Sequence, residues 1–313
     1  MSQERYMQAI VINAFGGPEQ LVLQEVPRPE PGPDEVLIRV EAAGIGPWDI
    51  KVRESLVGER QFPFILGWES AGIIEQVGAD VRDFAVGDAV YCYVREVGHY
   101  AEYIAVPAKL VARRPRTLDA AHAAAIPVSG ITAHQAITED LKLQAGETVL
   151  ITAAAGGTGT FAVQIAASLG AHVIASASAR NHAYLRELGA HEVIDYALSD
   201  VVEAVHTAHP LGVDAVLDCR GGEGVISNLS ALRAGGRMAF ITEAPEFLPS
   251  RGISAHMVIG RPDAQRLAVL AHMVDEKQLA VHLERAFPLA QAREAHELVE
   301  TGHVRGKVVL TLA

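Results

Sequence analysis

A run of β-branched and apolar residues leads directly into a loop of small residues that could bind a phosphate group. Residues 148–151 have the composition of a strand, residues 153–159 contain three glycines, and residues 161–166 have helical spacing. Glycines let the backbone approach a pyrophosphate, and the N–H groups at the start of a helix face its negative charge. The loop is not the usual G-x-G-x-x-G, but its place between a strand and a helix favours a dinucleotide site. The predicted contacts are Ala155, Gly156, Gly157, Thr158 and Gly159.

The end of the next predicted strand indicates which dinucleotide would bind. Sites for NAD usually place Asp or Glu about 20 residues after the glycine loop, where the carboxylate accepts from a ribose hydroxyl. This chain instead has Ser176, Ser178 and Arg180, and no acid. Two hydroxyls and a guanidinium suit a 2′-phosphate, so the pattern favours NADPH. The alternative is that Arg180 is an ordinary residue at the start of a helix.

Strands and helices alternate after the loop. The predicted strands are residues 171–176, 191–196, 212–218, 236–242 and 253–259, with helices at 180–188 and 226–232. Such alternation implies right-handed crossovers and a parallel sheet covered on both faces. An α/β domain without a nucleotide is the simpler interpretation. The strand at 253–259 is expected at the sheet edge, where it would pair with a second copy in a homodimer.

The N-terminal third has a different pattern, with short strands separated by glycines. Strands are predicted at residues 7–12, 35–44, 71–78, 84–91 and 98–106, which favours a small antiparallel, barrel-like fold. The final apolar strand, 305–312, is expected to return to this domain. The predicted division is therefore 1–122 and 261–313 for the discontinuous domain and 123–260 for the dinucleotide domain.

Composition excludes several classes of protein. The 313 residues carry a formal net charge of −12, which argues against nucleic acid as the main partner, because phosphate neutralisation needs a basic face. The two cysteines, Cys92 and Cys219, cannot build a disulfide framework or a Cys-rich zinc site. No apolar stretch is long enough to span a membrane and no signal peptide is visible, so a cytoplasmic protein with a small-molecule substrate is expected.

Motifs along nearly the whole chain resemble the zinc-free quinone oxidoreductase branch of the medium-chain dehydrogenase/reductase superfamily. The motifs are Phe15-Gly16-Gly17-Pro18-Glu19, Ala42-Ala43-Gly44-Ile45, Val86-Gly87-Asp88, Gly98-x-Tyr100-Ala101-Glu102-Tyr103, Val193-Ile194-Asp195-Tyr196 and Arg305-Gly306-Lys307. The resemblance implies an α/β protein with two domains and a cofactor cleft between them. One would be a doubly wound Rossmann sheet, and the other a discontinuous, mostly β, partly open GroES-like barrel that carries catalysis.

The positions of the zinc ligands in the related alcohol dehydrogenases hold residues that cannot bind zinc. Gly46 and Trp68 stand there, and neither supplies a ligand atom. His206 and His209 could share a helix face but are interpreted as a solvated pair, so no metal is predicted. Without a Lewis acid, the favoured reaction is hydride transfer from NADPH to acceptors that are already electrophilic, namely quinones or α,β-unsaturated carbonyls. The alternatives are a biosynthetic enoyl reductase for a larger or thioester intermediate and a non-catalytic NADPH-binding protein.

Further cofactor contacts follow from position. By the resemblance, Tyr196 would reach the 2′-phosphate and Thr132 the nicotinamide side. Three residues, Cys219, Ile241 and Thr242, follow predicted parallel strands, whose carboxyl ends collect ligands. Lys307 would add a cation, or else would be a surface lysine at a strand edge.

The predicted substrate residues are Gly46, Trp48, Lys51, Phe64 and Trp68. Lys51 stands where relatives carry a tyrosine, and its ammonium could stabilise an oxyanion or relay a proton, although a solvated lysine is the simpler interpretation. The two tryptophans would wall a pocket for a planar substrate or fill the core. Phe64 would line the mouth of that pocket.

Overall fold

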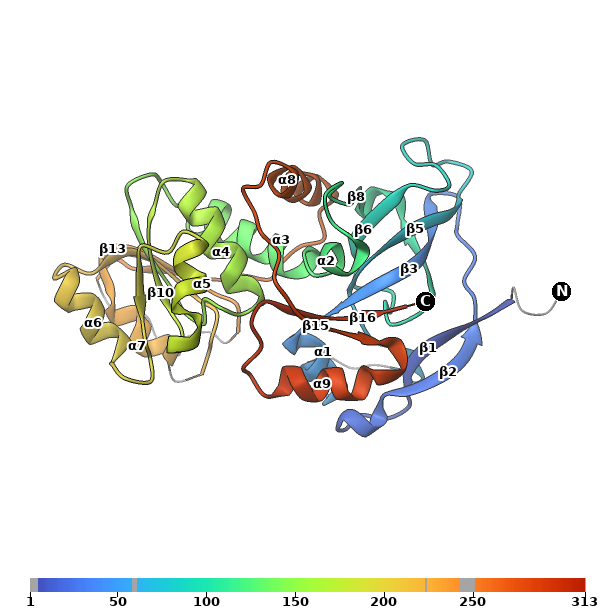
Figure 1. Ribbon diagram of the computed structural model, residues 1–313, viewed down its shortest axis with the longest axis horizontal. Coiled ribbons are helices and arrows are strands. Elements are labelled where there is room, and N and C mark those ends of the chain that lie inside the picture. The colour runs from blue at the N-terminus through green and yellow to red at the C-terminus, as the bar shows by residue number, and fades with distance from the viewer. Residues whose placement is uncertain (1–4, 58–60, 223, 243–250, 313) are drawn as a thin grey trace. The chain divides into compact units, whose positions relative to one another are not determined.

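The computed structural model describes residues 5–57, 61–222, 224–242 and 251–312. The chain divides into two units (Figure 1). The first contains Met1–Val128, Pro262–Glu276 and Val281–Ala313, and the second contains Ser129–Arg261 and Lys277–Ala280. The sequence placed these two boundaries after residues 122 and 260, which is six residues and one residue earlier.

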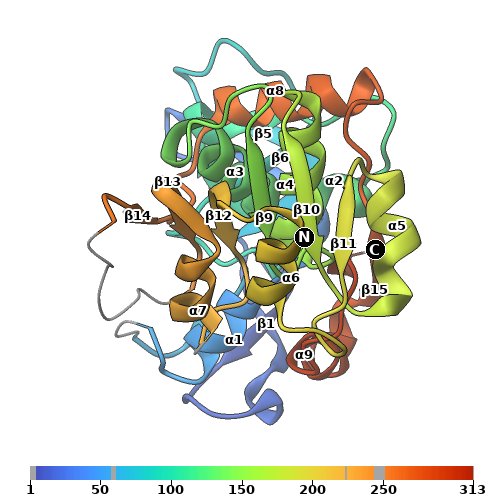
Figure 2. The same cartoon turned by 90° about the vertical axis from the view of Figure 1, so that its left-hand side faces the viewer.

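Within the described residues, the second unit is built on a six-stranded sheet in which every pairing is parallel. From one edge to the other the strands are β11 (Glu192–Ile194), β10 (His172–Ser176), β9 (Thr148–Ile151), β12 (Val213–Asp218), β13 (Leu232–Phe240) and β14 (Ser254–Met257), and Figure 2 shows this order. The doubly wound parallel sheet predicted from the sequence is confirmed, with β14 at its edge.

Helices cover both faces of this sheet, as Figure 1 shows. One face carries α4 (Gly157–Ser168) and α5 (His182–Glu187), and the other carries α6 (Val201–Ala208) and α7 (Gly224–Ser230). The central strand β9 is apolar throughout its buried part, Val149 to Ile151, because both of its faces are covered. β9 lies between β10 and β12, so the connections diverge to opposite sides at its carboxyl end, where such sheets bind ligands.

The first unit is mostly β, and in the described residues its strands form a seven-stranded and a three-stranded sheet. The larger sheet contains β15 (Leu283–Pro288), β16 (Lys307–Thr311), β3 (Glu35–Ile45), β5 (Glu69–Val77), β6 (Ala89–Tyr93) and β8 (Val111–Arg113), with β7 (Tyr103–Pro107) also paired to β3. The smaller contains β2 (Val22–Pro27), β1 (Tyr6–Ile12) and β4 (Phe64–Ile65). β16 pairs antiparallel with β3, so the last strand does return to the N-terminal part of the chain.

Two predicted strands begin later in the structure than the sequence indicates. The predicted strand at 84–91 begins later, at Ala89, because residues 85–88 form a turn in which the Ala85 N–H donates to the Asp88 carboxylate and Gly87 has a φ of +94°. The predicted strand at 98–106 begins at Tyr103. The remaining α-helices of the described residues are α1 (Pro47–Arg53), α2 (Ala120–Ala124), α3 (Pro127–Gln135), α8 (Ala264–Asp275) and α9 (Ala292–Glu300). Among the helices that the structure describes, none has the length and apolarity needed to cross a membrane.

Two histidines lie in the core of the first unit with neutral rings. His99 bonds the Ser70 hydroxyl at 2.8 Å and the Val94 carbonyl at 3.1 Å, and His296 accepts from the Arg53 guanidinium at 3.1 Å. Burial lowers the pKa of each ring to about 3, and the Arg53 charge adds to the effect at His296. Protonating either ring would therefore oppose folding.

Acid should destabilise the first unit through these two rings. The folded chain binds fewer protons than the unfolded chain between pH 6.5 and about 3, so their contribution is complete above pH 6.5 and is lost as the pH falls. At pH 4.5 each histidine should cost about 2–3 kcal/mol. Urea unfolding at pH 7 and 4.5 measures this, because both tryptophans lie in the first unit. A His296→Gln variant should lose the roughly 2–3 kcal/mol that this ring contributes between pH 7 and 4.5, while the opposite contribution of Asp49 stays unchanged. The exposed His272→Gln is the control, and an unchanged pH dependence in His296→Gln would contradict the assignment.

Candidate functional site

The glycine loop of the second unit has the geometry of an anion site. α4 begins at Gly157, directly after the loop that follows β9, and Gly156 precedes it in an extended conformation. Ala153, inside the loop, has a φ of +45° and turns the chain toward the helix. The first N–H groups of a helix have no partner within the helix, so they are available to a phosphate. The predicted residues Ala155 to Gly159 all lie in this turn and the first turn of α4.

Gly159 allows the loop and the helix to approach each other. A Cβ at this position would lie 2.6 Å from the Ala153 carbonyl oxygen and 2.7 Å from the Ala154 Cα. Both neighbours are backbone atoms, so neither could move away without changing the loop. In a dinucleotide-binding fingerprint, the last glycine allows this close packing.

Polar side chains gather at the carboxyl ends of β10, β11 and β12. Ser176 is buried at the end of β10, and Ser178 precedes the turn that carries the exposed Arg180. Tyr196 follows β11, and the Arg220 guanidinium lies 5.7 Å from the centroid of its ring. Arg220 was not predicted, because only the parallel pairing of distant strands brings residues 196 and 220 together. The group presents hydroxyls and guanidinium cations.

The ends of β12 and β13 contain a buried hydroxyl that could bond a ligand. The Thr242 Oγ1 is buried and has no hydrogen-bond partner in the described part of the chain. Such a group costs free energy unless a ligand satisfies it. A Cβ at Gly221 would lie 2.1 Å from this oxygen, so only glycine leaves room for the threonine. The residues at this end of the sheet therefore fit a dinucleotide.

The other predicted residues of the second unit have structural contacts. The Cys219 N–H donates to the Thr152 hydroxyl at 3.1 Å, and burial raises the pKa of the Cys219 thiol, which stays neutral. Ile241 donates its N–H to the Asp218 carbonyl. Thr132 is buried and packs closely against Gly260, where a Cβ would lie 2.4 Å from the Thr132 Oγ1. Their roles toward a cofactor remain predictions.

In the first unit, a buried ion pair lies beside the positions of the zinc ligands. The Lys307 ammonium donates to the Glu69 Oε1 at 2.6 Å and to the Ile45 carbonyl at 2.8 Å. A Cβ at Gly46 would lie 3.7 Å from the Lys307 Nζ. Glycine and tryptophan offer no donor to zinc, and an ammonium next to the site would repel a second cation. The residues present do not fit a catalytic zinc.

Glu69 is held on both carboxylate oxygens. Its Oε2 accepts from the Val128 N–H, near the start of α3, at 2.7 Å. Gly44 leaves the space, because a Cβ there would lie 2.5 Å from the Glu69 Oε1. Lys307 is therefore a buried residue on an interior strand and not a surface lysine at a strand edge. Its predicted cofactor contact stays a prediction.

Asp49 and Trp48 present two buried polar atoms without partners. Asp49 accepts from the Gly46 N–H through Oδ2 at 2.8 Å and so caps α1, whereas its Oδ1 and the Trp48 Nε1 have no hydrogen-bond partner among the described residues. Burial, with a smaller effect of the Glu69 charge, raises the pKa of Asp49 to about 7, against the opposing effects of the Gly46 hydrogen bond, the Lys307 charge and the nearby Tyr100 hydroxyl. This carboxyl can therefore hold a proton at neutral pH and release it. Asp49 was not predicted from the sequence, because an acidic capping residue at the third position of a helix is common.

The structure brings the predicted aromatic residues together in two groups. The Trp48 and Trp68 rings lie 5.6 Å apart between centroids with an interplanar angle of 59°. Phe64 stacks on Phe62 at 5.5 Å. Lys51 is half-buried and lies two residues beyond Asp49 in α1, so the two side chains point to different faces of the helix. A role for Lys51 stays a prediction.

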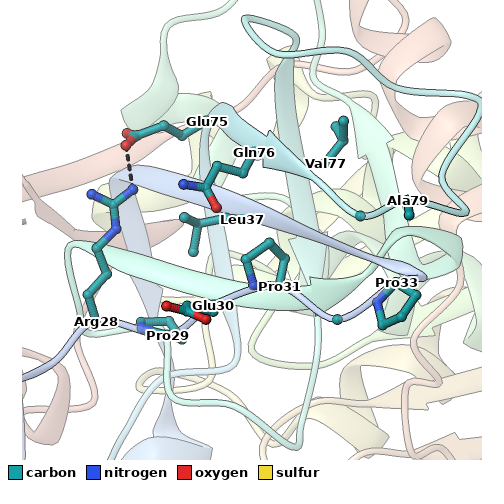
Figure 3. A pocket seen from close by; sticks show the side chains of 12 residues that line it. Arg28, Pro29, Glu30, Pro31, Pro33, Leu37, Glu75, Gln76, Val77 and Ala79 are labelled. Carbon is teal, nitrogen blue, oxygen red and sulfur yellow. Dashed lines mark hydrogen bonds and ion pairs between the residues drawn. The ribbon is translucent and has the colours of Figure 1, made fainter. Parts of the chain in front are cut away.

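A separate groove of about 610 Å³ lies at the other end of the β3–β5 pair (Figure 3). The proline-rich turn at residues 29–33 forms one wall, and Glu75 to Ala79 form another. Arg28 ion-pairs with Glu75 there and lies 3.8 Å from the centroid of the Tyr103 ring. Glu69 is at the opposite end of β5, so this groove is distinct from the site that contains Asp49 and the Lys307–Glu69 pair.

Family models match two parts of the chain. Residues 32–116 match the alcohol dehydrogenase GroES-like domain, and residues 188–310 match a model described as zinc-binding dehydrogenase. The words 'zinc-binding' describe that family and not this chain, because Gly46 and Trp68 stand at the positions of the zinc ligands. The first unit thus contains the GroES-like domain predicted from the resemblance.

Full-length relatives and solved structures are also similar. The chloroplast envelope quinone oxidoreductase homolog of Arabidopsis thaliana is 32% identical over 98% of both chains, and the 2-haloacrylate reductase of a Burkholderia species is 31% identical over 96% of this chain and 98% of its own. The structure of the quinone oxidoreductase of Coxiella burnetii is 33% identical with a TM-score of 0.90, covering 98% of this chain and all of that one. A mycobacterial structure complexed with NADPH is 29% identical with a TM-score of 0.89 and the same coverage.

Proposed function

Because the chain belongs to the quinone oxidoreductase branch of the medium-chain dehydrogenase/reductase superfamily, an NAD(P)H-dependent family, we propose that it is an NADPH-dependent reductase of quinones or α,β-unsaturated carbonyl compounds. The observation that carries the proposal is the pair of unsatisfied atoms on Trp48 and Asp49, next to a lysine–glutamate pair that stands beside the zinc-ligand positions. Residues that cannot hold a zinc favour an acceptor that is electrophilic by itself.

The second unit supplies the cofactor site in this proposal. The N–H groups at the start of α4 bind the pyrophosphate, and Thr242 donates its unsatisfied hydroxyl. Ser176, Ser178, Arg180 and Tyr196 favour the 2′-phosphate of NADPH, and Arg220 adds a second guanidinium beside Tyr196. When bound, the dihydronicotinamide supplies hydride. The NADPH-bound relative supports the same choice.

In this proposal, the first unit supplies the residues that bind the quinone or enone that accepts the hydride. The Trp48 and Trp68 rings present flat apolar surface to a planar acceptor, and the Trp48 Nε1–H offers a hydrogen bond to its carbonyl oxygen. Reduction of a quinone or enone adds a proton as well as a hydride. The protonated Asp49 carboxyl provides it, because its pKa of about 7 keeps a large fraction in the acid form at neutral pH. Lys51 is the second candidate for this proton transfer.

Cofactor choice should depend on Arg180. The Arg180→Ala variant should raise the KM for NADPH about 10- to 100-fold, because a hydrogen bond to a charged group contributes about 1.5–3 kcal/mol. The KM for NADH, which lacks the 2′-phosphate, should not change. Arg186→Ala, an exposed arginine on α5, is the matched control. An equal change for both cofactors would show that Arg180 only supports the fold.

The acceptor is tested by NADPH oxidation against quinones, enals, enones and enoyl thioesters. Turnover of quinones and enones supports the proposal. Turnover of thioesters alone would identify an enoyl reductase for a larger intermediate, and tight NADPH binding with no turnover would identify a non-catalytic protein. The name of the Burkholderia relative, a reductase of 2-haloacrylate, supports an activated alkene as acceptor.

Two copies of the chain are proposed to associate through β14. This strand pairs only with β13 among the described residues, and Met257 and Ile259 beside its free edge are exposed. Exposed apolar edge strands are sites of pairing between chains. Light scattering should give the mass of a dimer, and Met257→Lys should shift it to the monomer.

A further inference from the structure

Three side chains with metal-binding atoms converge at one edge of the parallel sheet. His172 is the first residue of β10, Glu192 is the first residue of β11, and His209 directly follows α6. The His172 and His209 Nε2 atoms lie 2.6 Å and 2.9 Å from the same carboxylate oxygen, Glu192 Oε1. All three ligand atoms lie within 4.8 Å of one another, and within the described residues no other group of three such side chains does so.

We propose that His172, Glu192 and His209 form a binding site for a divalent transition-metal ion of the Zn²⁺ type. Two imidazoles and a carboxylate are a donor set that zinc uses in proteins, and imidazole favours zinc, nickel and copper over the hard ions Mg²⁺ and Ca²⁺. A tetrahedral ion at about 2.0–2.2 Å from each ligand holds its donor atoms roughly 3.3–3.5 Å apart. The two distances from Nε2 to the Glu192 Oε1 need to lengthen by about 0.4–0.9 Å, which these side chains, 25–37% exposed, can accommodate.

Without a metal, both histidines donate their Nε2–H to the Glu192 carboxylate, so a bound ion would displace these two protons. Partial burial would raise the pKa of Glu192, but hydrogen bonds from His172 and His209 outweigh this effect and lower it. The His191 ring packs 4.6 Å from the His172 ring and bonds the Val173 N–H through its own Nδ1, so it braces the site without joining it.

Spacing along the sequence does not reveal the site formed by His172, Glu192 and His209, because the three residues are far apart in the chain. Spacing along the chain suggested a pair of His206 and His209, whereas His206 donates to the Ser230 carbonyl oxygen at 2.9 Å and His209 bonds Glu192. The prediction of no metal rested on spacings along the chain and on the zinc positions of the first unit. Parallel pairing of Ile174 with Glu192 is what places residues 172 and 192 side by side.

The position of the site indicates what a metal would do. It lies at the amino ends of β10 and β11, roughly 13 Å along β10 from Ser176, whereas the predicted cofactor residues lie at the carboxyl ends. The metal would connect the three-residue edge strand β11 to β10 and to the end of α6. We therefore expect it to stabilise the second unit without taking part in hydride transfer. This inference does not depend on the proposed function.

Binding is tested on the full chain after treatment with a chelator. Equilibrium dialysis with Zn²⁺ should give one bound ion per chain, and Co²⁺ should show the visible absorption of tetrahedral coordination. Saturating Zn²⁺ should raise Tm by about 5 °C. His172→Ala and His209→Ala should each weaken Zn²⁺ binding at least 10- to 100-fold. The exposed His272→Ala, outside the cluster, should bind as the wild type does.

A conservative variant keeps the test valid if an alanine variant unfolds. Glu192→Gln retains a hydrogen-bond acceptor for the histidines but loses the charge, so it should fold as the wild type does without metal and lose the Tm shift. Binding that is unchanged in His209→Ala, or no binding by the wild type, would overturn the proposal. Weak binding reduced equally by His272→Ala would identify scattered surface histidines and would also overturn it. NADPH-dependent activity should be the same with and without Zn²⁺, which separates this result from any failure of the reductase assay.

Discussion

Replacing Lys307 by methionine should lower the free energy of unfolding of the first unit by about 3–5 kcal/mol. Methionine fills much of the space, but the Glu69 carboxylate then keeps a buried charge whose only ionic partner among the described residues is gone. The Val128 N–H alone cannot compensate for it. Urea unfolding followed by tryptophan fluorescence measures the change, because both tryptophans lie in this unit.

The double variant separates the charge from the packing. Lys307→Met combined with Glu69→Gln removes both charges, and it should recover most of the lost stability, since buried ion pairs are often replaceable by neutral residues. Lys109→Met, at an exposed lysine of the same unit, should change stability by less than about 0.5 kcal/mol. If the double variant is as unstable as the single one, the loss comes from packing and the assignment is wrong.

Replacing Asp49 by asparagine should reduce kcat with enones and quinones by about 10²–10⁴-fold. The asparagine side-chain oxygen can still accept from the Gly46 N–H, so α1 keeps its cap while the proton donor is lost. The KM for NADPH should not change. In the wild type, kcat should fall as the pH rises through about 7, and this decline should be absent in the variant.

Stability gives a second measurement on Asp49 that does not need a substrate. Its pKa is about 7 in the folded chain and 3.8 as an ordinary carboxyl, so the folded state holds a proton that the unfolded state has released between these values. Its contribution to stability is therefore complete below pH 3.8 and is lost as the pH rises toward 7. Asp49→Asn should remove this decline. The exposed Asp34→Asn is the control.

Lys51 can be distinguished from Asp49 by the same assays. If Lys51→Met lowers kcat by about 10²–10⁴-fold and Asp49→Asn leaves kcat unchanged, the lysine transfers the proton and the role given to Asp49 is wrong. The reverse result leaves Lys51 as a half-buried lysine of α1.

The sequence by itself determined the features that contiguous residues build. The strand–loop–helix around Gly159, the alternating strands and helices, the edge position of β14 and the lack of zinc donors at Gly46 and Trp68 were all predicted from residue types and local spacing. Short or half-exposed strands were missed, as β2 shows. Its side chains are nowhere fully buried, so it has no continuous apolar run.

Only the tertiary structure decided which distant side chains share an environment. Lys307 and Glu69 are 238 residues apart, and they meet because the last strand pairs with β3. The raised pKa of Asp49 comes from burial, which depends on everything packed around α1. Likewise, His172, Glu192 and His209 converge because two parallel strands begin, and a helix ends, at the same edge of the sheet. Local composition sets which elements form, but desolvation and charge pairing are properties of the packed chain, so site chemistry is decided at that level.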